Sequence, residues 1–226
     1  MSLPAGGIAW EDETVPFPAN LGLTWWECLV SPDRFFRRVS WDGPRARPLL
    51  YLLIVAILGS LLGLFWFMSG PGDAAERLGV SLELQLLGFF LTPFAVLLAL
   101  GLVSLVQHLF VWLLAPGRRG LGATVTVLCY ASGVGVATAF LPPAMAFAWP
   151  ITGLLGATYL VFYFTLMVAA QVWYVVVLVI GLRNAHSTTT GQASAIVLLP
   201  MAIGLALTLA FVFATVALLT LQDLTV

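Results

Sequence analysis

Four long stretches without a charged residue constrain this chain more than any other feature of its sequence. They cover residues 48–72, 84–117, 120–182 and 184–222. A helix that crosses the ~30 Å hydrocarbon core of a bilayer needs about 20 apolar residues, so every run is long enough to span a membrane. Only 8% of the 226 residues are charged, against roughly 25% in a soluble domain. The chain is therefore predicted to be an integral membrane protein.

The third run is too long for one helix, and Pro142, Pro143 and Pro150 interrupt it. Proline cannot continue a helix without the loss of a backbone hydrogen bond, so we predict an all-α fold with five transmembrane helices. Pro93 and Pro200 fall inside predicted spans and should kink them. The predicted spans are residues 48–68, 86–114, 124–148, 151–180 and 193–221, which together make a membrane domain of residues 48–221 followed by a short tail, 222–226.

Two segments precede the first span. Residues 1–20 are acidic and contain three prolines, so they are expected to form a mobile cytoplasmic leader that buries no core. Residues 21–47 are predicted to form a short amphipathic helical segment. Thr24 and Glu27 fit a capping box for its first helix, while Ser31 and Pro32 fit the N-cap and first position of its second.

Arginine and aromatic side chains alternate around the second of these short helices. At ~100° per residue, Phe35 and Phe36 fall on one arc while Arg34, Arg37 and Arg38 fall on the other. This arrangement favours the membrane interface, where rings sit at headgroup depth and cations meet anionic lipid, but the rings could equally pack on the spans. The predicted interface residues are Arg34, Phe35, Phe36, Arg37, Arg38, Trp41, Arg45 and Arg47.

The arginines also predict the orientation of the chain. Cytoplasmic loops are enriched in basic residues, and five arginines precede the first span, whereas the next loop is net acidic. Arg118 and Arg119 follow the second span, and Arg183 follows the fourth. The N-terminus is therefore predicted inside and the C-terminus outside. Because the chain lacks lysine, as is typical of proteins from GC-rich bacterial genomes, we expect it in the cytoplasmic membrane of a bacterium.

Polar groups inside the spans are few and uncharged. Ion-coupled pumps usually need intramembrane charges, so a proton- or sodium-driven transporter is disfavoured. Uncharged polar residues at comparable depth near the cytoplasmic side could form one polar layer, or could simply join helices. The candidates for this layer are Gln107, His108, Tyr130, Ser132 and Gln171.

Cys28 and Cys129 make no metal-ligand cluster, and no catalytic motif is present, so no enzyme, cofactor or metal site is predicted.

The last cytoplasmic loop has its own signals. Thr189 and Gln192 fit a capping box that would begin the fifth span. Arg183 and His186 are placed to favour the C-terminal end of the fourth span and the inner leaflet. The alternative is that this loop binds a partner.

The order of four motifs resembles the prokaryotic members of the Yip domain family. The motifs are SPDRFF at residues 31–36, RPLL at 47–50, YAS at 130–132 and GLRNAHSTTTGQA at 181–193. The resemblance covers about residues 22–221, and it implies a five-helix membrane bundle with the N-terminus inside. Eukaryotic relatives interact with Rab-type GTPases, but their acidic-aromatic sequence near the first span is missing here. Rab binding is therefore not expected.

Two functions remain open at this point. The first is a non-enzymatic scaffold, membrane organiser or subunit of a membrane complex, with anionic inner-leaflet headgroups and a protein partner or a second copy as its contacts. The second is a channel, carrier or lipid scramblase that uses the polar layer. A membrane-embedded enzyme is a distant third. The formal net charge of −1 gives no reason to expect nucleic acid as a partner.

Overall fold

The computed structural model describes residues 7–69, 81–140 and 154–223, and every regular element in these ranges is a helix. This confirms the predicted all-α class. The elements are α1 (Ala19–Val30), α2 (Pro32–Arg38), α3 (Ala46–Ser69), α5 (Leu82–Leu114), α6 (Leu121–Ala131), α7 (Gly133–Ala139), α9 (Leu154–His186) and α10 (Thr190–Asp223).

Five of these helical units are long and apolar enough to cross a membrane, as predicted. They are α3, α5, α6 together with α7, α9 and α10. Several limits differ from the prediction. α9 runs to His186 rather than 180, and α10 already begins at Thr190, so the loop between them is short. The predicted end of the third span at 148 and start of the fourth at 151 lie outside the described residues.

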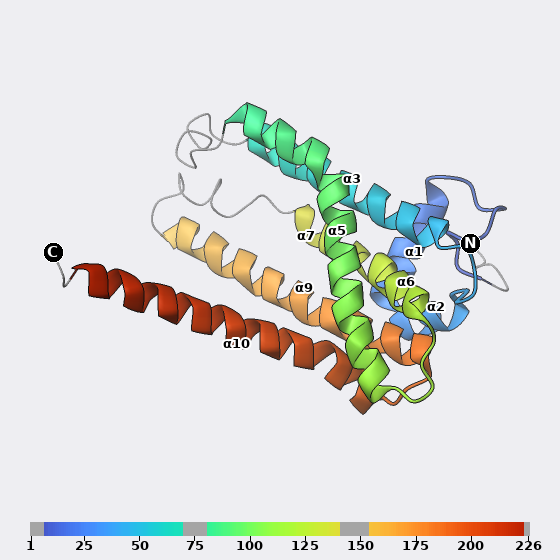
Figure 1. The fold of residues 1–226 in the computed structure, drawn as a ribbon. Helices are drawn as coiled ribbons and strands as arrows, with labels where there is room; N and C mark the ends of the chain where they lie inside the picture. The colour runs from blue at the N-terminus through green and yellow to red at the C-terminus, as the bar shows by residue number, and fades with distance from the viewer. Residues whose placement is uncertain (1–6, 70–80, 141–153, 224–226) are drawn as a thin grey trace.

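The long helices meet at one end of the molecule, beside α1, α2 and α6 (Figure 1). α3 packs on α5, α9 packs on α10, and α5 also contacts α6 and α10. Figure 1 shows that α5 changes direction after the part that runs beside α3. Pro93 lies inside α5 and removes a backbone hydrogen bond, which is a usual cause of such a bend. α10 contains Pro200 but shows no comparable bend.

The buried core lies where the short helices pack on the ends of the spans. Its largest members include Phe35 and Phe36 of α2, Tyr51 of α3 and Tyr130 of α6. Farther along the spans, large apolar side chains such as Phe211 are exposed. In a membrane such surfaces face lipid. The tightly packed part of the fold is the end that carries α1 and α2.

The leader corrects one expectation. Ile8 and Ala9 are almost fully buried and Trp10 is 9% exposed, all as part of this core. Residues 1–6 lie outside the described residues. The expectation that the leader buries no core is therefore wrong for residues 8–10. The sequence contains only three consecutive apolar residues at this point, too few for any periodicity to indicate burial.

The third span is broken between α6 and α7 at Ser132. A break inside a span leaves carbonyl groups without their helical partners, and these need other donors. Trp25 Nε1 donates to the carbonyl of Gly133 (2.7 Å), and the Ser132 hydroxyl donates to the carbonyl of Cys129 (2.6 Å). The Cys28 thiol lies 3.6 Å from the carbonyl of Tyr130. α1 thus supplies two of the groups that satisfy the break.

Candidate functional site

The predicted start is wrong for the first short helix, α1, and correct for the second, α2. α1 starts at Ala19, so Thr24 and Glu27 lie inside it and the predicted capping box is wrong. The Thr24 hydroxyl instead accepts from the backbone N–H of Trp10 (2.9 Å), and the Glu27 carboxylate pairs with Arg38. These contacts span long sequence separations, which a local spacing cannot show. α2 begins with Ser31 at the N-cap and Pro32 at the first position, as predicted.

The aromatic face of α2 packs on protein. Phe35 and Phe36 are 0% exposed. The Phe35 ring meets the Tyr130 ring edge-on at 5.4 Å, and the Phe36 ring stacks on Trp41 at 6.4 Å. Packing on the spans is therefore confirmed for Phe35 and Phe36, while the depth of these rings in the membrane stays a prediction. Burial of these two rings contributes roughly 2–3 kcal/mol each to holding α2 on the core.

α2 is also tied to the end of α9 through Asp33. Asp33 Oδ2 pairs with Arg37 (2.6 Å), while Oδ1 pairs with Arg183 and accepts from Asn184 Nδ2 (3.2 Å). The hydrogen bond from Asn184, and then the charges of Arg37 and Arg183, hold the pKa of the Asp33 carboxyl below its usual value. Arg183 thus joins the end of α9 to the SPDRFF motif.

The leader is fastened to α3 and α6 by polar contacts. Trp10 Nε1 donates to the carbonyl of Arg47 (2.7 Å), and the Tyr130 hydroxyl donates to Glu11 Oε1 (3.0 Å). Arg47 also pairs with Glu13 at 2.5 Å and donates to the carbonyl of Glu11. Arg47 therefore acts as an anchor for residues 10–13, in addition to any role at the lipid surface.

A hydrogen-bond relay joins α9, α6 and α5. The backbone N–H of Arg119 donates to His186 Nδ1 (3.1 Å), so this nitrogen must carry a lone pair. His186 then bears its proton on Nε2 and donates to the Thr124 hydroxyl (3.0 Å). That hydroxyl is left to donate to His108 Nδ1, 3.0 Å away. His186 is fully buried and does not face the leaflet, which corrects its predicted role.

The turn between α9 and α10 confirms the predicted capping box. The backbone N–H of Thr189 donates to Gln192 Oε1 (3.1 Å), and the backbone N–H of Gln192 donates to the Thr189 hydroxyl (3.2 Å). α9 ends with Ser187 at a φ of 52°, and the N–H of Thr188 reaches back to the carbonyl of Arg183 (3.2 Å). This is a Schellman-type helix end. It fixes the end of α9 at His186, six residues beyond the predicted limit of the fourth span at residue 180.

The predicted polar layer does not form as one unit. His108 belongs to the relay, and Tyr130 points to Glu11 in the aromatic core. Gln107 is buried, and its Oε1 has no hydrogen-bond partner in the described part of the chain. Ser132 and Gln171 do lie together, because both line one cavity. Ser132 lies at the break between α6 and α7, and Gln171 lies on α9, which packs against both of these helices.

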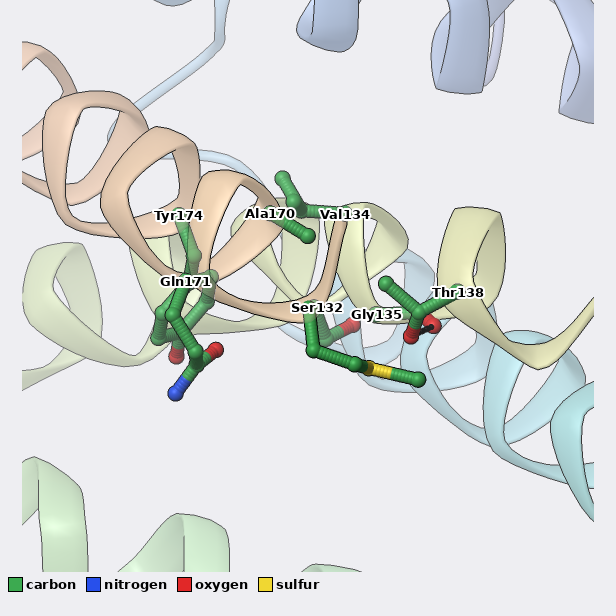
Figure 2. Close-up of a pocket in the computed structure, with 8 residues that line it drawn as sticks. Ser132, Val134, Gly135, Thr138, Ala170, Gln171 and Tyr174 are labelled. Atoms are coloured by element: carbon green, nitrogen blue, oxygen red, sulfur yellow. Dashed lines mark hydrogen bonds between the residues drawn. The ribbon is translucent and has the colours of Figure 1, made fainter. Parts of the chain in front are cut away.

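That cavity has a volume of about 310 Å³ and lies between α7 and α9. Ser132, Gly135 and Thr138 line one wall, and Gln171 and Tyr174 line the other (Figure 2). In Figure 2 the amide of Gln171 points away from α9 into the open space. A second, mostly apolar cavity of about 220 Å³ lies toward α3 and α5 and shares Ser132 and Gly135.

Several long-range hydrogen bonds were also not predicted from the sequence. Trp10, Glu11, Trp25 and Thr124 each bond to groups at least 14 residues away, and no local spacing indicates such contacts. Within residues 7–69, 81–140 and 154–223, no group of three or more His, Cys, Asp or Glu side chains could hold a metal ion.

Five apolar spanning helices define the class: this is a multi-pass, all-helical integral membrane protein. The Yip1 domain family matches residues 26–211, which is most of the chain, so the protein belongs to the Yip1 family. No curated protein and no solved structure matches it significantly.

Proposed function

We propose that this protein is a non-enzymatic scaffold or complex subunit of a bacterial cytoplasmic membrane, and that its α1–α2 end is the part that holds a partner. The observation that carries the proposal is the way this end is built. α1 and α2 lie outside the spans, yet buried rings and the ion pair between Asp33 and Arg183 hold them to the membrane domain. The Glu27–Arg38 ion pair joins α1 to α2. A rigid surface is pre-organised for binding.

The exposed face of α1 supplies the contact surface. Trp26 is 60% exposed and Val30 is 55% exposed, and at a separation of four residues they lie on one face of the helix. Arg34 is exposed at the start of α2, which follows directly. Tryptophan and arginine are among the residues enriched in interface hot spots. We infer that Trp26, Val30 and Arg34 contact a membrane-protein partner or a second copy of the chain.

The test compares two variants in nanodiscs. We expect the wild-type protein to be isolated with a stoichiometric protein partner or as a defined oligomer, and the double variant Trp26→Ser/Val30→Ser to lose this association at least tenfold. The control is Phe17→Ser, since Phe17 is equally exposed (65%) but precedes α1. A wild-type protein that is reproducibly a lone monomer, or equal association in all three proteins, would contradict the proposal.

A second candidate is a channel, carrier or lipid scramblase, and the two cavities at the Ser132 break favour it. A hollow that holds several polar side chains along a broken span is the kind of site that transporters place near the bilayer midplane.

This candidate is tested by flux or lipid scrambling in proteoliposomes. Gln171→Leu and Thr138→Val remove polar groups from the larger cavity and should lower the rate severalfold. Thr208→Val is the matched control, because Thr208 and Thr138 each donate only to a carbonyl of their own helix, and Thr208 lines neither cavity. Flux that none of these variants alters would exclude this route.

A further inference from the structure

The described arginines divide into two groups. Arg37, Arg38, Arg47 and Arg183 form ion pairs with Asp33, Glu27 and Glu13. No carboxylate pairs with the others in the described part of the chain, and these unpaired arginines are Arg34, Arg45, Arg118 and Arg119. Three of the four converge on one place, the start of α6.

The convergence follows from two segments that are far apart in sequence. The guanidinium of Arg45, just before α3, lies against the backbone of Gly122, so that any side chain at Gly122 would collide with it. Arg118 and Arg119 immediately precede Gly120, the N-cap of α6, which carries no side-chain cap. The Arg45 side chain thus contacts the first turn of α6, and Arg118 and Arg119 occupy the two positions before its N-cap; we call these three residues the α6 arginine cluster.

Two tryptophans orient this cluster. The guanidinium carbon of Arg119 lies 5.9 Å from the centre of the Trp41 ring, and that of Arg118 lies 5.7 Å from the centre of the Trp112 ring. A guanidinium that rests on an aromatic face keeps its N–H groups free in its own plane. These donors match the geometry of phosphate oxygens, to which arginine binds in a bidentate manner.

The position of the cluster selects the source of the phosphate. α3 begins at Ala46, α5 ends at Leu114 and α6 begins at Leu121, so the cluster lies where three spans end together. That is the level of lipid headgroups, where tryptophan is enriched. Three cations without an ion-pair partner in the described part of the chain gain most from an anion there. The exposed carboxylate of Asp42, next to Trp41, forms no ion pair with them.

We propose that Arg45, Arg118 and Arg119 form a binding site for the phosphate of an anionic phospholipid headgroup, with Trp41 and Trp112 beside the glycerol and upper acyl region. The site is independent of any protein partner at Trp26 and Val30. It also explains why Arg45 lies on Gly122: the smallest residue lets the guanidinium approach the first turn of α6, whose free N–H groups add to the positive potential.

The test measures lipid retention by the purified, delipidated protein. Phosphatidylglycerol or phosphatidylcholine is added in detergent, bound lipid is counted by native mass spectrometry, and the melting temperature is followed. We expect phosphatidylglycerol to bind and to raise the melting temperature, while Arg45→Gln/Arg118→Gln weakens its binding at least fivefold. The matched control, Arg34→Gln/Arg37→Gln, removes the same charge from exposed positions on α2 and should retain wild-type binding.

Each other outcome overturns the proposal. Equal loss in both double variants would indicate unspecific charge attraction, and equal binding of phosphatidylcholine would remove the requirement for an anionic headgroup. An equal shift with inorganic phosphate would make a free anion the ligand. Because Gln at position 45 alters a packed contact, Arg118→Gln alone, at an exposed residue, must reproduce at least part of the loss. The isolated protein is used throughout, so failure here leaves the proposed scaffold role untouched.

Discussion

At the scale of single residues, Gly133 in the broken span lies against two aromatic side chains. A Cβ atom there would lie 2.5 Å from the hydroxyl of Tyr51 and 3.0 Å from Cδ1 of Trp25. Tyr51 is part of the buried core, and the Trp25 ring is fixed by its hydrogen bond to the backbone carbonyl of Gly133. Glycine is needed here for close packing and not for an unusual backbone angle.

We therefore expect Gly133→Ala to destabilise the protein by about 1–3 kcal/mol, the usual cost of an overpacked core site. Gly135→Ala is the matched control, because nothing lies within 4 Å of a Cβ atom at Gly135 on the same helix. Thermal unfolding in detergent, followed by intrinsic tryptophan fluorescence, measures the difference. Equal melting temperatures for the two variants would show that Tyr51 and Trp25 can move aside.

At the scale of helices, the relay through Thr124 holds three elements together. Thr124→Val leaves His186 Nε2 and His108 Nδ1 without their shared partner, and a buried polar group without a partner costs about 1–3 kcal/mol. Thr126→Val is the control, since Thr126 is equally buried but donates only to the carbonyl of Gly122 in its own helix. Chemical denaturation in detergent should show the larger loss for Thr124→Val.

The contact between α2 and α9 should depend on pH. Because the folded-state pKa of Asp33 is lowered, its stabilising contribution is present above the unfolded value of about 3.8 and is lost as the pH falls through the folded-state pKa. We expect Asp33→Asn to melt at a lower temperature than wild type at pH 7, and this difference to shrink below about pH 4. Asp42→Asn, which removes an exposed carboxylate without an ion pair, is the control. A difference that is constant from pH 7 to pH 3 would contradict the electrostatic explanation.

At the scale of the whole molecule, the two chain ends are predicted on opposite sides of the membrane. Both native cysteines are buried, and burial followed by the charge of Glu27 raises the pKa of the Cys28 thiol, so both should resist alkylation. A membrane-impermeant maleimide should therefore label Thr225→Cys in intact cells and Asp42→Cys only after lysis. The reverse pattern would overturn the predicted orientation and place the α1–α2 end outside.

The sequence by itself determined the class and the number of spans. Runs without charge and proline interruptions are local properties of the sequence, and the hydrocarbon core of a bilayer accepts only long apolar helices. It also determined the helix start at Ser31, where Pro32 takes the first helical position, and the start at Thr189, which bonds to Gln192 three residues later.

Only the tertiary structure decided which polar and aromatic groups meet. Trp10 on Arg47, Tyr130 on Glu11 and His186 on Thr124 join residues that lie 37, 119 and 62 positions apart. It likewise buried Phe35 and Phe36 and divided the predicted polar layer. Helical periodicity shows which face of a helix is apolar, but lipid and protein both accept an apolar face, so only the packing of the helices distinguishes them.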